Sequence, residues 1–339
     1  MIRNRPLFPI SGYLAGCPPI GGQAVMDGVM MRNGEVYGLA VRMNNGAIFG
    51  QRLPWRTYLA SPWARLPFVR GFPVLLETLV NGIHALNRSV ELAGEDNPSS
   101  SGSLAMVFSV VLALLLALAL FVVAPHLLSL IMLWLGLGAD VEGLSFHLWD
   151  GFYKCAIFIG YIWAISLVPD IRKVFEYHGA EHKIIHAWET GEGVEAKSAF
   201  FMSRLHPRCG TTFLLFVITL SIVLQAFIVP LCLHIWSPAN AVAKHVFSIA
   251  IKLALVAPIS AIAYELIRYA ANLPPGLFRN ILQTPGLLLQ RLTTREPSKA
   301  QIEVAIVALA EALDSEDSLD VHPADFVHVE TALDSGTSA

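Results

Sequence analysis

Long apolar runs dominate the middle of the chain. From Asn97 to Ala139 there is no Lys, Arg, Asp or Glu, and 104–135 consists almost entirely of Leu, Val, Ala, Ile and Phe. A helix needs about 20 apolar residues to cross the hydrocarbon core of a bilayer, so this run is long enough to span with some tilt. We expect Pro125 to kink the helix without dividing it.

Three more apolar runs follow, at 152–169, 213–236 and 246–267. Lys154 lies near one end of the second run and Lys252 lies about two turns into the fourth, where long side chains can reach the membrane interface. Glu265, at the other end of the fourth run, has Arg268 three residues on as its natural partner. The pattern predicts four transmembrane helices within 104–270.

Polar segments flank these runs. Residues 1–65 predict a small β unit, since two strand-like runs, 35–43 and 47–55, are separated by Asn44, Asn45 and Gly46, which tolerate positive φ. Residues 66–93 predict an amphipathic helix whose apolar stripe could lie on the membrane interface or pack on the bundle. Further segments are a linker at 94–103, a C-terminal helical segment at 271–313 and a disordered acidic tail at 314–339.

The C-terminal helical segment carries its own start signals. Thr294 or Glu296 can cap a helix and Pro297 fits its first turn. Its predicted buried stripe is Ile302, Ala305, Ile306, Leu309 and Leu313.

Composition and charge support a membrane protein with a defined orientation. The chain has 339 residues, of which 55% are hydrophobic and 14% charged, whereas soluble domains carry roughly 25% charged residues. Basic residues gather before the first run, between the second and third, and after the fourth, while loop 140–150 has none. The positive-inside rule therefore predicts a multi-pass protein of the bacterial cytoplasmic membrane with both termini in the cytoplasm.

The basic residues also bear on partners. Eight acids from Glu311 onward leave five more basic than acidic residues in the rest of the chain, which suits an anionic lipid leaflet. Nucleic acid is not expected, because the arginines are scattered without interleaved aromatic residues. The four cysteines have no paired spacing, so no disulfide framework is predicted.

The string "YHGAEH" between the second and third runs holds candidate metal ligands. His178, Glu181 and His182 stand at i, i+3 and i+4, so on a helix they share one face. The order H-x-x-E-H is that of the inverzincin signature, where the histidines bind zinc and the glutamate acts as base. The alternative is a solvated polar face, with Gly179 marking the helix start.

A second ligand-rich string, "HPRCG", follows in the same cytoplasmic loop, 170–212. Histidine and cysteine together suit zinc, although the string could also be a turn with an inert thiol. We predict a divalent-metal site, with zinc as the cofactor and Glu181 as general base. Its predicted ligands are His178, His182, His206, Cys209 and Glu189.

The string "IGGQAVMDGVMMRNG" is the third candidate. Its glycines match no phosphate-binding loop, and its methionines read as a core patch beside a turn. Asp27 is the residue to which we assign a catalytic role here, because an acid among Met, Val and Gly requires a partner if it is buried.

The strings "GGQAVMDGVMMR", "YHGAEHK", "HPRCGTTF" and "LTTREP" together resemble the YqhQ-like family of bacterial membrane proteins, a domain of unknown function. The resemblance covers roughly residues 17–312. It implies a multi-span membrane protein, often labelled a predicted metal-dependent enzyme, and the family's occurrence beside translation-related genes points to ribosome or nascent-chain partners. Members more often have Glu where this chain has Asp27, which keeps the charge and shortens its reach.

Two functions fit these observations. The first is a membrane-bound, metal-dependent hydrolase acting at the cytoplasmic surface. The second is a non-catalytic membrane scaffold that docks cytoplasmic proteins, in which the His/Cys cluster is structural.

Overall fold

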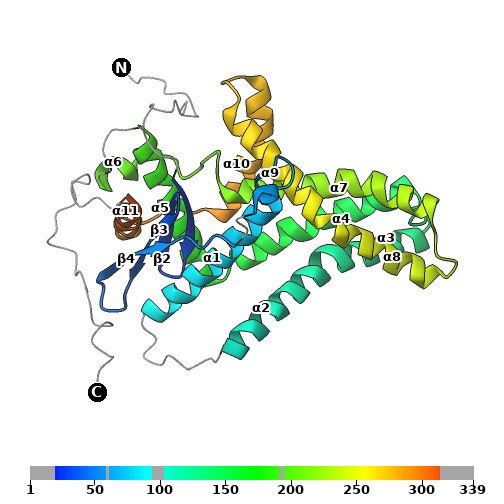
Figure 1. Ribbon diagram of the computed structural model, residues 1–339, viewed down its shortest axis with the longest axis horizontal. Coiled ribbons are helices and arrows are strands. Elements are labelled where there is room, and N and C mark those ends of the chain that lie inside the picture. The colour runs from blue at the N-terminus through cyan, green and yellow to red at the C-terminus, as the bar shows by residue number, and fades with distance from the viewer. Residues whose placement is uncertain (1–19, 59–60, 94–102, 191–193, 195, 314–339) are drawn as a thin grey trace.

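The computed structural model describes residues 20–58, 61–93, 103–190, 194 and 196–313. Most of this part of the chain is helical, with one small antiparallel sheet near its N-terminal end (Figure 1). The predicted fold class, mainly α with a small N-terminal β unit, is confirmed to that extent. Most of the expected linker and the expected acidic tail lie outside the described residues, as does Cys17.

The sheet is a meander of four strands in chain order. The strands are β1 (Gly21–Val25), β2 (Gly28–Asn33), β3 (Val36–Arg42) and β4 (Ile48–Pro54). Between β3 and β4 the chain turns as its Asn-Asn-Gly sequence predicts, with Gly46 at a φ of 86°. The methionine-rich string, where we expected only a turn region, forms the whole β1–β2 hairpin.

Helices cover both faces of the sheet. Met31 points into a core shared with α5 (Pro169–Thr190) and α11 (Lys299–Leu313). Met30 points to the opposite face, into a core that includes Ala85 of α1 (Gly71–Leu92). Successive residues of a strand face opposite sides, so adjacent methionines are both buried because the sheet is packed on both sides.

Helix α11 buries the apolar stripe that its sequence indicates: Ile302, Ala305, Ile306 and Leu309 are each 3% exposed or less. It begins later than expected. Ser298 Oγ accepts a hydrogen bond from the Gln301 backbone at 3.3 Å, and the Gln301 side chain accepts one from the Ser298 backbone at 2.8 Å. This reciprocal pair is a capping box, so Ser298 starts the helix and neither Thr294 nor Glu296 does.

Close packing of α11 on β3 depends on Gly38. A Cβ there would overlap the carbonyl oxygen of Ala308 and lie 2.6 Å from the backbone nitrogen of Ala312. We expect Gly38→Ala to reduce the free energy of unfolding by about 1–3 kcal/mol, the usual cost of overpacking, measured by thermal unfolding. Gly21→Ala is the matched control because nothing lies within 4 Å of its Cβ position; equal effects of the two changes would contradict the packing argument.

Helix α1 turns its apolar stripe outward. Its buried positions are small or polar, among them Asn81, Ala85 and Ser89. Leu76 is 38% exposed and Leu79 47% exposed. Leu75 and Ile83 are half-buried, so the stripe is partly covered and both interpretations, interface and bundle, stay predictions.

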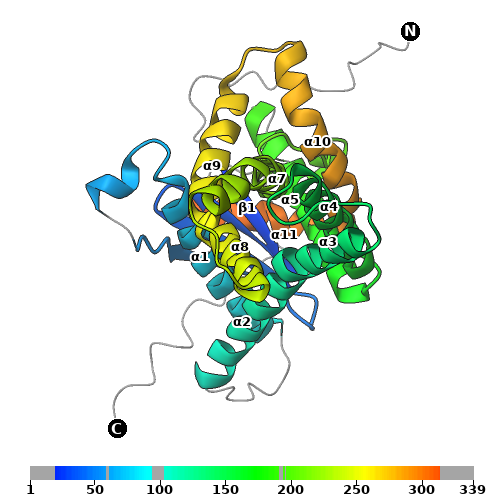
Figure 2. The same ribbon diagram turned by 90° about the vertical axis from the view of Figure 1, so that its right-hand side faces the viewer.

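The remaining helices form an elongated bundle. They include α2 (Ser103–Leu118), a π-helical segment η2 (Ala119–Val123), α3 (Ala124–Trp134), α4 (Leu144–Ile165), α7 (Gly210–Ile235), α8 (Ala241–Ala254) and α9 (Val256–Asn272). Figure 2 shows α3, α4, α7 and α8 around a common centre. The π-helical segment directly precedes Pro125, so the first apolar run continues as one helical path with a changed register.

Three helical stretches are long and apolar enough to cross a membrane: 107–134, 210–235 and 241–272. A fourth is added if α4 and α5, bent by 98° at their junction, are taken as one span. Judged by length and composition, the structure therefore contains three to four candidate transmembrane helices, against the four predicted.

The predictions for two lysines in these runs are wrong, and the expected ion pair of Glu265 forms with a different arginine. Lys154 and Lys252 do not reach an interface, since they are 5% and 1% exposed and both contact Asp150. That aspartate lies within α4, which begins eight residues before the apolar run expected there. Glu265 pairs with Arg70 through two 2.6 Å contacts, because α1 packs against α9.

Two short helices and α10 complete the fold. They are η1 (Pro62–Arg65), α6 (Ala196–Phe200) and α10 (Leu277–Thr293). After α10 the chain runs extended along α5, and the Arg295 backbone donates a hydrogen bond to the Phe175 carbonyl at 2.8 Å. This return segment, residues 294–298, joins the bundle to the sheet.

Candidate metal centre

The histidine-rich string forms the C-terminal half of α5, where ten residues from Tyr177 to Ala187 are buried. Gly179 lies in the middle of this helix, so the interpretation that it marks the helix start is wrong. A Cβ at Gly179 would overlap the carbonyl oxygen of Arg295, so glycine is needed for the return segment to pass. The face that could have been solvated is instead enclosed.

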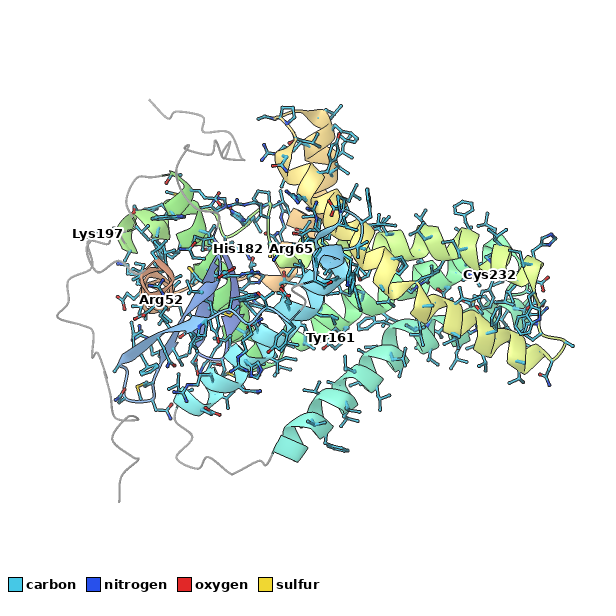
Figure 3. All side chains as sticks on the ribbon, in the orientation of Figure 1. Arg52, Arg65, Tyr161, His182, Lys197 and Cys232 are labelled. Carbon is cyan, nitrogen blue, oxygen red and sulfur yellow. The ribbon has the colours of Figure 1, made fainter. Side chains whose placement is uncertain are left out.

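His178, His182 and Cys209 come together at this enclosed face. Their ligand atoms all lie within 4.8 Å of one another, so this group could hold a metal ion. The Nε2 atom of His178 lies 3.2 Å from Cys209 Sγ. Figure 3 shows His182 near the junction of the sheet and the bundle, with Cys232 toward the opposite end of the bundle.

Backbone carbonyls orient both imidazoles. His178 Nδ1 is 2.9 Å from the Thr293 carbonyl, and His182 Nδ1 is 2.6 Å from the Arg204 carbonyl. A neutral ring that donates through Nδ1 carries its lone pair on Nε2, and metal-binding histidines are generally held in this way. His182 Nε2 is buried and has no hydrogen-bond partner among the described residues.

The protonation states also suit metal binding. Burial lowers the pKa of His182 to about 4, so its ring is neutral near pH 7. Burial alone would raise the pKa of the Cys209 thiol, but the two hydrogen bonds from Thr211 favour the thiolate and help to leave that pKa below its ordinary value. Cys209 also caps the N-terminus of α7, where the helix dipole favours a thiolate.

Glu181 lies beside this group and against the sheet. It is 4% exposed, and its Oε2 has no hydrogen-bond partner in the described part of the chain. A Cβ at Gly22 of β1 would lie 2.6 Å from Glu181 Oε1, so glycine there leaves room for the carboxyl. Burial raises the pKa of Glu181 to about 8.

The other expected ligands form a second group. His186, Glu189 and His206 also bring their ligand atoms within 4.8 Å of one another, and the His206 and His186 ring centroids are 4.5 Å apart. Burial lowers the pKa of both histidines to about 4. The one site expected from the sequence is therefore two adjacent groups.

The second group fits a metal less well, because its atoms are already engaged. Glu189 pairs with Arg208, and His206 Nε2 lies 3.4 Å from Glu189 Oε2. The Arg208 backbone donates to His206 Nδ1 at 3.3 Å. His186 Nε2 lies 2.9 Å from the Leu205 carbonyl.

Asp27 belongs to neither group. It occupies the β1–β2 turn with a φ of 48°, and its side chain is 31% exposed and 3.8 Å from Lys173. A turn residue in a left-handed conformation explains an acid at this position, since Asp tolerates such backbone angles. The structure does not bring Asp27 to Glu181.

The pattern of the sequence did not single out the groups that support these side chains. The side-chain amide of Gln290 of α10 accepts a hydrogen bond from the His206 N–H and donates one to the His206 carbonyl, each at 2.8 Å. Lys183 donates to the Phe200 and Met202 carbonyls and pairs with Glu296 at 3.0 Å. Most of these contacts use backbone atoms, which a residue pattern does not reveal. The string "LTTREP" was the one available signal, since it covers the end of α10 and most of the return segment.

Comparisons with known proteins place the chain in a family. Residues 66–315 match the family described as "Protein of unknown function (DUF1385)". The chain belongs to this family. It is also 31% identical over 314 residues to the "Uncharacterized protein YqhQ" of Bacillus subtilis (strain 168), covering 87% of this chain and 92% of that protein. No solved structure matches it.

Proposed function

We propose that this protein is an integral membrane protein that binds zinc through His178, His182 and Cys209 and hydrolyses its substrate at the cytoplasmic membrane surface. One observation carries the proposal: two imidazoles fixed by backbone carbonyls direct Nε2 toward one buried cysteine. Histidines that serve only as hydrogen-bonded core residues would not need their Nε2 atoms to point toward one cysteine.

The ligand set fits zinc in number and spacing. Zn–N and Zn–S bonds of about 2.0 and 2.3 Å put tetrahedral ligand atoms about 3.5 Å apart, and the His178 Nε2 to Cys209 Sγ distance is 3.2 Å. Three protein ligands leave a fourth position, the arrangement of catalytic zinc sites. A bound zinc would supply Lewis acidity and lower the pKa of a water molecule.

Glu181 is the group that handles the proton. Its carboxyl is buried beside the ligand set, its Oε2 has no hydrogen-bond partner among the described residues, and near neutral pH it can either hold or accept a proton. General acid–base catalysis works best when the pKa lies near the working pH, and that of Glu181 is raised to about 8.

The membrane location rests on the apolar helices and on α1. Three to four helices are long and apolar enough to cross a bilayer, and the leucines of α1 face outward beside them. The basic residues of loop 170–208 put the metal centre on the cytoplasmic side by the positive-inside rule.

Zinc content tests the proposed centre. We expect purified protein to hold about one zinc ion per chain, and His182→Ala and Cys209→Ser to lose most of it, measured by elemental analysis after dialysis. His234→Ala and Cys232→Ser are matched controls, because both residues lie toward the far end of α7. Zinc-free wild-type protein, or variants that keep their zinc, would refute the centre.

Cobalt substitution separates a catalytic site from a structural one. A hydroxamate that enters a free coordination position should change the visible spectrum of the cobalt protein. Because Cys209→Ser removes the thiolate, it should also remove the sulfur-to-cobalt charge-transfer band. A spectrum that hydroxamate leaves unchanged would mean a closed, structural site and would favour the membrane scaffold.

A further inference from the structure

The centre of the bundle contains a connected row of ionisable side chains that the metal centre does not use. Lys252 Nζ lies 2.5 Å from Asp150 Oδ1, and Lys154 Nζ lies 3.4 Å from Asp150 Oδ2. On its other side, Lys252 Nζ is 3.2 Å from His126 Nδ1, and His126 Nε2 is 3.2 Å from His245 Nδ1. We call these five residues the bundle row.

Four helices enclose the bundle row. His126 comes from α3, Asp150 and Lys154 come from α4, and His245 and Lys252 come from α8. Gln225 of α7 accepts a hydrogen bond from Lys154 at 2.7 Å. His147 of α4 lies next to the row. Its Nε2 is 2.9 Å from the Val141 carbonyl oxygen, and its Nδ1 is buried with no hydrogen-bond partner among the described residues.

The charges of the bundle row do not balance. Among the residues that the structure describes, Asp150 is the one carboxylate in contact with Lys154 or Lys252. A structural ion pair needs one ammonium and one carboxylate, whereas this row holds two ammonium groups when both lysines are protonated. An uncompensated charge in a low-dielectric interior is costly, so one proton of the row is held weakly and can leave.

The row leads to one end of the bundle. His245 is half-buried in the first turn of α8, directly after Lys244. Lys244 is 2.7 Å from Glu142 in the loop between α3 and α4, at the end of the bundle far from the metal centre (Figure 1). At the other end of the row, beyond its contact with Asp150, Lys154 donates a hydrogen bond to the neutral side chain of Gln225.

We propose that the bundle contains a proton-binding site centred on Lys252 and Asp150, which exchanges its proton with the membrane face opposite the metal centre through His126 and His245. Each imidazole accepts a proton on one nitrogen and releases the proton of its other nitrogen, so the ring returns to its starting charge. The proton ends on the Lys252 amine. The proposal goes beyond the hydrolase and depends only on the bundle crossing the membrane.

Charge movement after a pH jump tests this site. Protein reconstituted into liposomes of phosphatidylcholine and phosphatidylglycerol is adsorbed on a solid-supported membrane, and the external pH is lowered rapidly. Because a proton that enters the bundle row moves charge into the bilayer, wild-type protein should give a transient current. Lys252→Met should reduce the current to that of protein-free liposomes, and Lys244→Met, which changes an exposed ion pair at the same end, should retain it.

A folding check on Lys252→Met and one further variant, His245→Phe, guard against a trivial loss of folding. Lys252→Met leaves Asp150 paired with Lys154 as a neutral pair, so the variant should elute as wild-type protein does in size-exclusion chromatography. His245→Phe keeps an aromatic ring beside His126 and Phe146 and should slow the current while Lys252 is unchanged. No wild-type current, or an equal current in Lys252→Met, would overturn the proposal.

Discussion

Replacing Glu181 with glutamine is expected to raise the thermal unfolding midpoint of the metal-free protein between about pH 7 and pH 9. Burial raises the pKa of Glu181 from 4.5 to about 8, whereas in the unfolded chain it stays near 4.5. Between those two values the unfolded state releases the proton while the folded state holds it. The stability of the wild type is therefore full at acid pH and falls as the pH rises toward 8.

The expected loss is large. One pKa unit corresponds to about 1.4 kcal/mol, so the wild type loses up to about 5 kcal/mol through this one carboxyl when the pH exceeds its folded-state pKa. Glutamine has nearly the same shape and no proton to lose, so the variant should escape that loss. A residue that weakens the fold to this degree is typical of a functional site.

Unfolding midpoints in the presence of a chelator, taken across this pH range, measure the effect. Glu91→Gln is the matched control, because Glu91 is exposed and pairs with Arg88 one turn earlier. The curves of wild type and Glu181→Gln should converge at acid pH and separate above it. Parallel curves would show that the fold does not hold Glu181 in its protonated form.

Gly179→Ala is expected to weaken zinc binding about tenfold or more, because overpacking costs about 1–3 kcal/mol. The added methyl group would overlap the Arg295 carbonyl. That backbone cannot move alone, since the Arg295 N–H is bonded to Phe175 at 2.8 Å and the Thr293 carbonyl, two residues before it, orients His178. Displacing the return segment therefore turns a ligand away.

Competition with a chromophoric zinc chelator measures the affinity, and thermal unfolding measures stability. Gly160→Ala is the matched control: it also lies within a helix, but nothing stands within 4 Å of its Cβ position. It should be neutral or slightly stabilising, because alanine favours a helix by up to about 1 kcal/mol over glycine. An unchanged zinc affinity in Gly179→Ala would mean that the return segment does not position His178.

The elements that sequence reasoning placed well are those with a strong local period. The apolar runs, the Asn-Asn-Gly hairpin and the buried stripe of α11 each follow from spacing within one segment. The stripe of α1 shows the limit of that reasoning. Its leucines recur at helical spacing, yet they face outward while Ala85 and Ser89 pack inward, because close packing against β3 and α9 selects small residues.

The sequence predicted which residues could bind a metal, but not that they form two separate groups. Spacing on one helix put His178 and His182 on the same face, and the nearby string supplied Cys209 and His206. Which of these last two completes the group with His178 and His182 depends on the path of the chain from Arg204 to Cys209, and the structure selects Cys209. Backbone carbonyls from Thr293 and Arg204 then orient the rings.

Lys154 and Lys252 make the same point within the bundle. A lysine near the end of an apolar run is usually interpreted as extending to the membrane interface when the run itself contains no acidic partner. Asp150 supplies that partner from an earlier turn of α4, and α8 brings Lys252 to the same carboxylate. Sequence separation hides the contact with Lys252, whereas Asp150 lies one turn before Lys154 on the same helix and was missed because the apolar run was taken to begin at residue 152.

The sequence by itself determined which segments are apolar enough for a membrane, where the chain turns between β3 and β4, which face of α11 is buried, and which side chains can bind a metal. The tertiary structure alone decided that Gly179 is the crossing point of two chain segments, that the expected single site is two groups, and that two lysines share one buried aspartate. Local period and residue chemistry act within a few turns of the chain. Burial, charge pairing and ligand geometry arise only when distant segments come into contact.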